Sequence, residues 1–429
     1  MQKNSCMEEK FELVGQYNAW DGKAFPLGYV RHEYTDRIAR YTGNRLVKVL
    51  TGQRRSGKSF VLRQLAMRLI DDGVNPHNIL MLNLDLAAFD FIHTYYDLID
   101  VLQLYIDNVK PQGRIYIFID EIQNVEGWER FVNSYSQDYT YEYEIFITGS
   151  NSKLLSGELA TLLSGRYVSF EIFPFSFYEY ADIKGLPFSR QTYLEYMQQG
   201  GMPELINLPD EDVRQNYISS LKDTLLLRDI IQRHYVSDAR LLEDLFVYAI
   251  NNTSKLFSVN SIVKYYKSLG RSVGHEKIAQ YLAYLSEAYL THRVERFNIQ
   301  GKETIAGLCK YYANDLSFHN YLYRGVLHGL GYALENLVYL SLKRMGYEVY
   351  VGDVRGKEVD FVARRGDRLV YVQSVYMLYD EQTIEREYAS LESITDHYEK
   401  YVVSLDEVQL PSRNGIGHIQ AWRLNEVLG

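Results

Sequence analysis

Residues 46–65 have the sequence LVKVLTGQRRSGKSFVLRQL, in which a short apolar run ends at Gly52 and an apolar-periodic segment begins at Phe60. Between them lies GQRRSGKS, a complete G-x-x-x-x-G-K-S pattern. Gly52 and Gly57 let the backbone wrap closely around a phosphate, and the helix that begins near Lys58 adds the positive end of its dipole. Because the pattern lies between a strand and a helix, it predicts a nucleotide site.

Each part of this loop has an expected role. Lys58 is expected to reach the β- and γ-phosphates of the nucleotide, and the Ser59 hydroxyl is expected to hold Mg²⁺. The residues expected to contact the nucleotide are Gly52, Gln53, Arg54, Arg55, Ser56, Gly57, Lys58, Ser59 and Phe60.

A second apolar run, IYIFID at residues 115–120, ends in a carboxylate and is followed by Glu121. Such a run is typical of a strand buried on both faces of a parallel sheet. An aspartate at the end of that strand holds Mg²⁺ beside a phosphate-binding loop, so we expect Asp120 to bind the metal together with Ser59. Glu121 is then placed to polarise an attacking water, which favours ATP hydrolysis over phosphate transfer to another acceptor.

The composition excludes several classes of protein. A chain of 429 residues is too long for a single core, so two or three domains are expected. A hydrophobic content of 46% with 24% charged residues is typical of a soluble globular protein. No run approaches the ~18–20 apolar residues of a membrane helix. The net charge of −9 argues against extensive binding to nucleic acid, although a local basic patch is compatible with it.

The N-terminal residues and the cysteines indicate a cytoplasmic protein. The start, MQKNSCMEEKFELV, lacks the basic-then-apolar order of a signal peptide. Cys6 and Cys309 are the only cysteines, too few for a disulfide framework or a zinc site, which fits a reducing compartment.

The segment before the first strand has two expected parts. Residues 1–24 are expected to be loosely held, within a leader that extends to residue 30. Residues 31–40 (RHEYTDRIAR) are expected to form a helix with Ile38 on its apolar side. Tyr29 and Arg31 are candidates to cover the adenine, and the alternative is that they belong to a surface helix.

Further apolar runs complete the predicted sheet, at residues 79–85 (ILMLNLD) and 144–148 (EIFIT). Strands that alternate with helical stretches imply a parallel, doubly wound sheet with the nucleotide at the carboxyl ends of its strands. The expected fold class of this part is therefore α/β.

Polar residues follow the last of these strands, in TGSNS at residues 148–152. Asn151 or Ser150 can act there as a polar sensor that positions water, and a glycine-containing turn with a helix N-cap explains the pattern equally well. Arg166 comes next, in LSGR. An arginine placed in cis or in trans stabilises the transferring phosphoryl group, an effect of ~10³–10⁵ in rate, whereas the alternative is a surface charge. Glu121, Asn151 and Arg166 are the candidate catalytic residues.

The order of these motifs resembles a known family. GQRRSGKS is followed by FIDEIQNVEGWE, FITGSNSKLLSGE, LLSGRY, FPFSFYEY and QGGMPE. This order is similar to that of bacterial and archaeal AAA-type ATPases that carry a conserved C-terminal domain of unknown function, and it covers most of the chain from about Arg31. The resemblance implies an AAA-like P-loop NTPase core, a helical and winged-helix middle, and a restriction-endonuclease-like α/β C-terminal domain. It also implies that Gly201-Met202-Pro203 senses the nucleotide, although this element is equally a turn that ends a helix.

The middle of the chain predicts a winged helix-turn-helix. Helical patterns at residues 241–250, 259–269 and 274–290 precede a hairpin with Gln300-Gly301-Lys302 at its tip. DNA binding would place the third helix in the major groove and basic side chains on phosphates, the candidates being Lys264, Lys267, Arg271, His275, Lys277 and Lys302. The third helix itself offers Glu276, Gln280, Tyr281 and Glu287 more than Arg or Lys, so a structural or protein-contacting role is the alternative.

The last part has the order helix, three-strand meander, helix and strand, which is the topology of restriction-nuclease-like cores. Asp360 takes the first acid position, and Glu335 takes the helix position. Gln373 stands where a second metal-binding carboxylate belongs, and Val375 stands where the lysine belongs, so we expect no nuclease activity. The alternative is that Glu358 substitutes for the missing acid.

Together these patterns predict a cytoplasmic ATP-dependent molecular switch with ATP and Mg²⁺ as cofactors. The expected partners are ATP and an unidentified protein, with DNA possible through the winged helix and no membrane. The alternatives are a nucleic-acid-processing or defence enzyme that uses the C-terminal domain, and a winged-helix DNA-binding regulator. The expected parts are a leader (1–30), the ATPase domain (31–185), a helical lid (186–235), the winged helix (236–316) and the nuclease-like domain (317–429).

Overall fold

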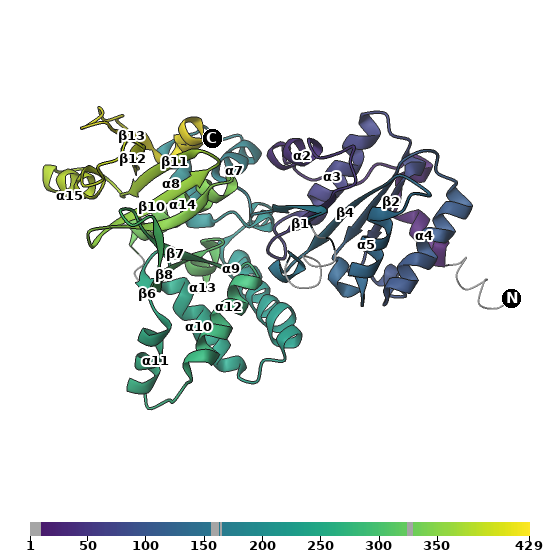
Figure 1. Cartoon of the computed structure of the whole chain (residues 1–429), viewed down its shortest axis with the longest axis horizontal. Coiled ribbons are helices and arrows are strands. Elements are labelled where there is room, and N and C mark those ends of the chain that lie inside the picture. The colour runs from purple at the N-terminus through teal and green to yellow at the C-terminus, as the bar shows by residue number, and fades with distance from the viewer. Residues whose placement is uncertain (1–9, 156–162, 164, 324–328) are drawn as a thin grey trace. The chain divides into compact units, whose positions relative to one another are not determined.

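The computed structural model describes residues 10–155, 163, 165–323 and 329–429. The chain forms two compact units, residues 1–172 and residues 173–429, each with its own sheet (Figure 1). Residues 1–9 of the expected leader, Ser164 of the LSGR motif, and His328 in the expected C-terminal domain lie outside the described residues. Within the described ranges, no helix is long and apolar enough to cross a membrane.

The first unit is built on a five-stranded sheet in the order β2-β3-β4-β1-β5, in which every neighbouring pair is parallel. Its apolar strands are buried on both faces, as parallel sheets require. This confirms the predicted α/β class with a parallel sheet. The strands are β1 (Val47–Thr51), β2 (Ile79–Asn83), β3 (Ile115–Asp120), β4 (Tyr143–Gly149) and β5 (Tyr167–Glu171).

Helices cover both faces of this sheet. Alternation along β2 shows the layering, because Ile79 and Met81 join the core under α2 and α3 whereas Leu80 and Leu82 join the core under α4 and α5. The helices are α2 (His32–Ala39), α3 (Lys58–Asp71), α4 (Tyr95–Val109) and α5 (Trp128–Gln137). Short 3₁₀ turns are η1 (Ala19–Asp21), η2 (Pro76–Asn78), η3 (Ala87–Phe89), η4 (Ile122–Asn124) and η5 (Ser152–Leu155).

The segment that precedes α2 is tied to the edge of the sheet. The Asn18 amide donates to the Met81 carbonyl, the Met81 N–H donates back to Asn18, and the Trp20 indole donates to the Ile79 carbonyl. Val14 is fully buried. The expectation of a loosely held leader is therefore wrong for residues 14–20, because Asn18 and Trp20 pair with the backbone of the edge strand β2, whereas residues 21–24 are exposed.

A buried ion pair joins β1 to β4 at the amino ends of the strands. Lys48 Nζ lies 2.5 Å from Glu144 Oε1, and both side chains are fully buried. Burial lowers the pKa of Lys48, and the Glu144 carboxylate opposes that shift. Glu144 also accepts from the Gly43 N–H at 3.0 Å and lies 3.4 Å from Arg114.

We expect Lys48→Met to destabilise the first unit by roughly 3 kcal/mol, because it leaves a buried carboxylate without its main counter-ion. The measurement is urea unfolding followed by tryptophan fluorescence, since Trp20 and Trp128 lie in this unit. Lys23→Met, which breaks an exposed pair with Asp21, is the matched control and should leave the transition unchanged. Equal transitions for the two variants would contradict the expectation.

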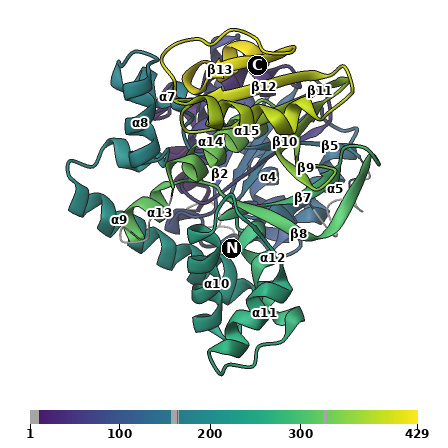
Figure 2. The same cartoon turned by 90° about the vertical axis from the view of Figure 1, so that its left-hand side faces the viewer.

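The second unit contains an eight-stranded mixed sheet in the order β13-β12-β11-β10-β9-β7-β8-β6 (Figure 2). The pairs β7–β9, β11–β12 and β12–β13 are parallel, and the others are antiparallel. The strands are β6 (Leu256–Phe257), β7 (Thr291–Asn298), β8 (Glu303–Ala313), β9 (Glu348–Val354), β10 (Lys357–Arg365), β11 (Arg368–Ser374), β12 (Glu399–Ser404) and β13 (Ile416–Gln420).

One face of this sheet packs against α7, α8, α14 and α16, and the other packs against α15. The expected boundary at residues 185/186 differs from the break between the units, which follows Ile172, because Phe177 and Tyr180 of α7 join the core under α14. These helices are α7 (Phe177–Lys184), α8 (Arg190–Gln199), α14 (Leu330–Arg344), α15 (Glu381–Glu392) and α16 (Leu424–Leu428), with the turn η8 (Ala421–Arg423).

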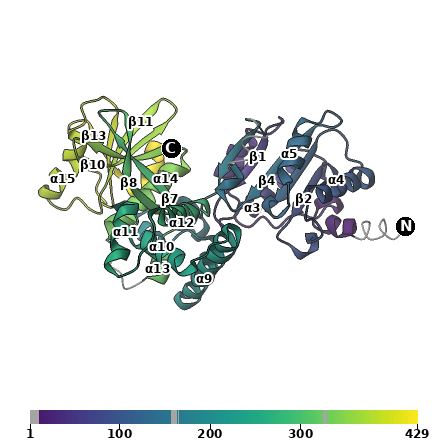
Figure 3. The ribbon, with the colours of Figure 1, turned by 60° about the horizontal axis from the view of Figure 1, so that its bottom comes forward.

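A separate helical core lies beside β6–β8 (Figure 3). It contains η6 (Pro203–Ile206), α9 (Glu211–Thr224), the π-helix η7 (Leu225–Gln232), α10 (Ala239–Asn251), α11 (Val259–Ser268), α12 (His275–Glu287) and α13 (Ser317–Leu322). The three helices α10–α12 and the β7–β8 hairpin agree with the sequence-based ranges. The predicted order of helix, meander, helix and strand is also present, as α14, β9–β11, α15 and β12.

Candidate functional site

The loop between β1 and α3 has the backbone of a phosphate-binding turn. Gly52, Arg55 and Gly57 all have positive φ, at 142°, 69° and 102°. A β-carbon on Gly52 would lie 2.3 Å from the carbonyl oxygen of Ile172, so the close passage of the chain after β5 requires glycine there. A turn with such residues can direct several backbone N–H groups toward one side, which forms a concave surface that suits an anion.

Lys58 lies inside this loop. Its ammonium group donates to the carbonyls of Gly52 and Gln53 at 3.0 and 3.1 Å, and its side chain is 3% exposed. Glu121 Oε1 lies 3.6 Å from Lys58 Nζ. A lysine charge is thus held at the centre of the loop, next to the carboxylate that sequence predicts to polarise water.

Asp120 and Ser59 are brought together as predicted. Both lie at the carboxyl edge of the sheet, and the Ser59 hydroxyl hydrogen-bonds to the Asp120 carboxylate. The Thr148 hydroxyl donates to Asp120 Oδ1. Burial raises the pKa of Asp120, and the nearby Glu121 charge adds to that shift. A cation beside Asp120 would relieve both effects.

Glu121 has a left-handed backbone, with φ 56° and ψ 48°. Its N–H donates to the Thr148 hydroxyl at 2.9 Å, so Thr148 contacts both acidic residues. The Gln123 amide donates to Glu121 Oε2. Although burial opposes the charged form, Lys58 and Arg54 hold the pKa of Glu121 below its ordinary value. Non-glycine residues in this conformation are costly and concentrate at functional sites.

The polar residues after β4 are buried beside Glu121. Ser150 and Asn151 are 0% and 2% exposed, and Ser150 contributes to the lowered pKa of Glu121. Gly149 has no room for a side chain, because a β-carbon there would lie 1.7 Å from Leu154. Both candidate sensors, Ser150 and Asn151, are therefore buried after β4, and their proposed roles stay predictions.

The remaining residues of the loop differ in their exposure to solvent. Ser56 and Gln53 are buried, and the Ser56 hydroxyl has no hydrogen-bond partner among the described residues. Arg54 lies 3.3 Å from Asp85. Arg55 is exposed, as is Phe60, whose ring packs under Gly28.

Arg31 binds the backbone of the phosphate-binding loop. Its guanidinium donates to the Ser56 carbonyl at 2.9 Å, and its side chain is almost completely buried. The Gln64 amide donates to the carbonyls of Leu27 and Tyr29, which ties this segment to α3. The Arg31 side chain is therefore bound to the backbone of the loop, and an adenine contact by Tyr29 or Arg31 stays a prediction.

A cavity of about 460 Å³ is lined in part by Ser59 and Asp120, the predicted metal ligands. Its other walls come from Arg63 on α3, Asn83 at the end of β2, and the segment 16–26. Sequence reasoning missed this wall, because the N-terminal segment has no motif. The available signal was apolar Val14 and Trp20 before the first predicted helix.

The donor set fits ATP with Mg²⁺. A concave backbone turn and a buried lysine suit phosphates, and the unpaired Ser56 hydroxyl lies on the same loop. Hydroxyl and carboxylate oxygens from Ser59 and Asp120 are hard ligands of the kind that Mg²⁺ prefers, and this ion keeps several waters when one or two protein groups hold it.

Comparison with known proteins agrees with this geometry. An AAA domain matches residues 44–181, and a domain of unknown function (DUF8612) matches residues 190–328. An uncharacterized protein of Haemophilus influenzae is 34% identical over 382 residues, which cover 87% of this chain and 92% of the relative. Uncharacterized protein MJ1544 of Methanocaldococcus jannaschii is 30% identical over 389 residues, which cover 85% of this chain and 81% of that relative. The chain belongs to the AAA-type ATPase family.

Solved structures similar to this AAA-type ATPase include two archaeal proteins. The Walker-type ATPase PABY2304 of Pyrococcus abyssi has a TM-score of 0.42 and 16% identity, covering 68% of this chain and 95% of that one. Cdc6p of Pyrobaculum aerophilum has a TM-score of 0.31 and 14% identity, covering 70% of this chain and 96% of that one.

Arg166 is a candidate catalytic residue that lies far from the phosphate-binding loop of the same chain. The Val47 N–H donates to the Arg166 carbonyl at 2.9 Å, so Arg166 lies at the amino end of β1. The phosphate-binding loop begins after Thr51 at the other end of that strand, roughly 15 Å away at about 3.3 Å per residue. Arg166 is exposed there.

The Gly201-Met202-Pro203 element of the ATPase lies in the second unit. The Gly201 N–H donates to Asp315 Oδ2 at 2.7 Å, and the Phe175 N–H donates to the Gly201 carbonyl. Because a β-carbon on Gly201 would lie 2.2 Å from the Phe175 carbonyl oxygen, glycine is required for this close contact. The element connects the chain before α7 to the turn after β8.

Proposed function

We propose that the first unit binds ATP with Mg²⁺ and hydrolyses it slowly, so that the protein works as a nucleotide-dependent switch. The observation that carries this proposal is the buried Lys58 ammonium, held within the glycine loop 3.6 Å from Glu121 and beside the Ser59–Asp120 pair. A lysine with no ligand to bind would normally lie in solvent, whereas the Lys58 side chain is only 3% exposed.

Each residue has a defined task in this proposal. Lys58 and the backbone N–H groups of residues 52–60 hold the phosphates, and Ser59 and Asp120 hold Mg²⁺, which supplies charge neutralisation when bound. Glu121 accepts a hydrogen bond from the attacking water and takes up its proton. Thr148 and Gln123 keep the two acidic residues in place.

Hydrolysis becomes a switch through differential affinity. ATP shifts the balance between two arrangements of the protein only as far as it binds one of them more tightly. We propose that the helical region with the expected winged helix and the nuclease-like C-terminal part are what the nucleotide state controls. The Gly201-Met202-Pro203 element, anchored to Asp315, is the proposed point at which the second unit responds.

We propose a protein partner rather than DNA for the winged helix. Two of its basic candidates are already paired with acids, since Arg271 lies 2.9 Å from Asp244 and Lys277 lies 3.8 Å from Asp238. Tyr281 of α12 is buried and therefore cannot reach a base. A salt-dependent gel shift with duplex DNA at low ionic strength would instead support the DNA-binding alternative.

The wild-type protein tests the proposal directly. Isothermal titration with ATP in the presence of Mg²⁺ should give one site per chain, and phosphate release should be measurable and require the metal. Hydrogen exchange of residues 173–429 should differ between the ATP and ADP states. If titration gave no heat of ATP binding and no phosphate were released, the proposed function would be contradicted. If ATP bound and was hydrolysed without a change in hydrogen exchange, the protein would be an ATPase but not a switch.

Arg166 gives a prediction about how copies of the chain cooperate. Since Arg166 lies at the far end of β1, we propose that it acts on the nucleotide of a second copy. Arg166→Ala should then lower turnover at least tenfold with ATP affinity unchanged. Arg45→Ala is the matched control, because Arg45 is exposed near the same edge of the sheet.

Mixing two inactive variants separates action in trans from a surface role. Arg166→Ala keeps Glu121, and Glu121→Gln keeps Arg166, so a mixed assembly contains intact sites if the arginine comes from a neighbour. We expect phosphate release from the mixture to exceed that of either variant alone. A mixture as slow as its components, or an Arg166→Ala variant as fast as wild type, would contradict a role in trans.

A further inference from the structure

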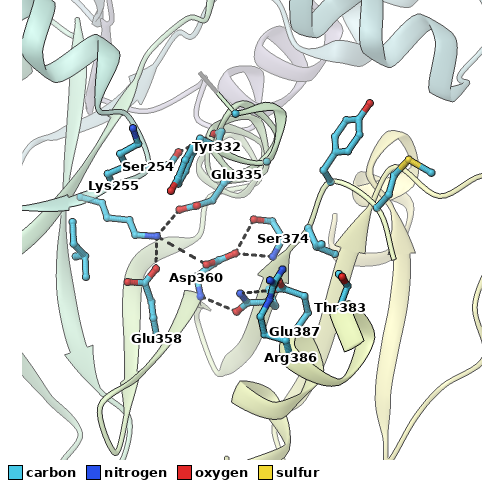
Figure 4. Close-up of a pocket in the computed structure, with 18 of the residues that line it drawn as sticks. Ser254, Lys255, Tyr332, Glu335, Glu358, Asp360, Ser374, Thr383, Arg386 and Glu387 are labelled. Atoms are coloured by element: carbon cyan, nitrogen blue, oxygen red, sulfur yellow. Dashed lines mark hydrogen bonds and ion pairs between the residues drawn. The ribbon is translucent and has the colours of Figure 1, made fainter. Parts of the chain in front are cut away.

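The second unit contains a buried lysine surrounded by carboxylates. Lys310 Nζ lies 2.8 Å from Glu335 Oε1, 2.6 Å from Glu358 Oε1 and 4.0 Å from Asp360 Oδ1. The Lys310 side chain is 3% exposed. Figure 4 shows the side chains of Glu335, Glu358 and Asp360 pointing toward one another from α14 and β10.

The carboxylates are held in place by neutral donors. Asp360 Oδ2 accepts from the Ser374 N–H and hydroxyl, both at 2.8 Å. Glu335 Oε1 accepts from the Tyr312 hydroxyl at 2.7 Å. The register of β10 shifts beside Asp360, and its N–H donates to the Gln373 side-chain oxygen instead of to the strand β9. The acids are therefore fixed by β8, β10 and β11.

Lys310 is the cation of this cluster. Its ammonium group lies among three acidic side chains, which raise the pKa of Lys310 even though burial alone would lower it. Burial, followed by the Asp360 charge, raises the pKa of Glu335 to about 8. Without an ammonium group in this position the cluster would hold only buried negative charge, which is costly.

A cavity of about 560 Å³ gives solvent access to the cluster. Besides the acids and Lys310, its walls include Lys255 near β6, Tyr332 on α14, and Arg386 and Glu387 on α15. An ion from solution can therefore reach Glu358 and Asp360. Among the described residues, no three His, Cys, Asp or Glu side chains are placed to hold a metal ion, and in this cluster Lys310 lies between the acids.

We propose that the Lys310 ammonium group is the built-in cation of this site, and that it occupies the position among Glu335, Glu358 and Asp360 that a divalent metal ion would otherwise take. The cluster is then complete without metal. It joins strand β8 to helix α14 and strand β10, and carboxylate oxygens of Glu335 and Asp360 already accept hydrogen bonds from N–H and hydroxyl donors. This inference is independent of ATP hydrolysis in the first unit.

The test is Mn²⁺ binding followed by electron paramagnetic resonance of the free ion. An Asp120→Asn background without nucleotide removes the metal site of the first unit. Lys310→Met should bind Mn²⁺ at one site per chain, at least tenfold more tightly than the parent, because three hard oxygen ligands lose their internal cation. Adding Asp360→Asn to Lys310→Met should abolish that binding.

Two further variants test whether the expected Mn²⁺ binding comes from loss of the positive charge at position 310 or from loss of any lysine in the cavity. Lys255→Met removes a lysine that lines the same cavity, and Lys310→Arg keeps a positive charge, so neither should gain Mn²⁺ binding. Folded Lys310→Met protein that binds no more Mn²⁺ than its parent would overturn the proposal.

The parent protein decides the question if the Lys310 variants do not fold. Mn²⁺ binding by the parent that disappears with Asp360→Asn would show that the cluster accepts metal beside the lysine, and this would overturn the proposal. Mn²⁺ binding that is equal with and without Asp360→Asn supports it. Circular dichroism of each variant establishes which comparison applies.

Discussion

Replacing Glu121 with glutamine is expected to lower ATP hydrolysis by about 10²–10⁴-fold, the range typical of a lost general base, while ATP binding is retained. Glutamine keeps the size of the side chain and can still accept the hydrogen bond from Gln123, but it cannot take a proton from water. Phosphate release under saturating ATP and Mg²⁺ measures the rate, and isothermal titration measures the affinity.

The surroundings of Glu121 also fix the direction of the affinity change. The wild-type carboxylate lies 3.6 Å from Lys58 and attracts the charge that is expected to bind phosphate. Removing that attraction leaves the ammonium group more available, so Glu121→Gln should bind ATP as tightly as wild type or somewhat more tightly. Asp120 is still expected to hold the metal, since its contacts with Ser59 and Thr148 do not involve the Glu121 side chain.

Glu126→Gln is the matched control for this experiment. Glu126 is an exposed acid on the same connection after β3, and the same change of charge there should alter neither rate nor affinity. Phosphate release from Glu121→Gln at the wild-type rate would place the general base elsewhere in the protein. Loss of ATP binding in Glu121→Gln would instead show that the carboxylate positions Lys58.

The parallel sheet could be predicted because its strands are apolar over their full length. Residues 115–120 became β3 with the expected bounds, and residues 47–50 lie within β1. Burial on both faces leaves few other structures open to runs of this kind. The loop that follows β1 was also predictable, because its glycines are needed at positive φ whatever surrounds them.

Contacts between distant segments could not be predicted in the same way. Thr148 donates to Asp120 only because β3 and β4 are neighbours in the sheet, and a threonine after an apolar run has no special pattern. The fixed leader shows the same limit, since Asn18 acts through hydrogen bonds to the backbone of β2. Such bonds depend on register and leave no periodicity in the sequence.

Lys310 shows how a missing residue can be supplied from another strand. The sequence offers Val375 at the expected lysine position of the C-terminal part, and that residue is buried in an apolar core. The structure places the ammonium of Lys310 at the acids from β8, which precedes the helix α14 in the chain. Linear spacing on one strand is therefore insufficient to decide whether a cation faces Asp360.

Replacing Lys58, the lysine of the phosphate-binding loop, is the second substitution for which we expect a large effect. Lys58→Ala is expected to abolish measurable ATP binding, because it removes the one buried positive charge that the loop places at its centre. Isothermal titration with ATP and Mg²⁺ measures this loss. The protein concentration is raised to about 100-fold above the wild-type Kd, so that weak remaining binding is still detected.

A structural explanation has to be separated from the loss of charge, since Lys58 also donates to the Gly52 and Gln53 carbonyls. Arg68→Ala is the matched control, because it removes a charge from the solvent side of the same helix α3, where Arg68 pairs with Asp36. Lys58→Ala that unfolds at the same temperature as Arg68→Ala but binds no ATP would assign the loss to the missing ammonium group. Unchanged affinity in Lys58→Ala would contradict the phosphate-binding assignment of the loop and, with it, the proposed switch.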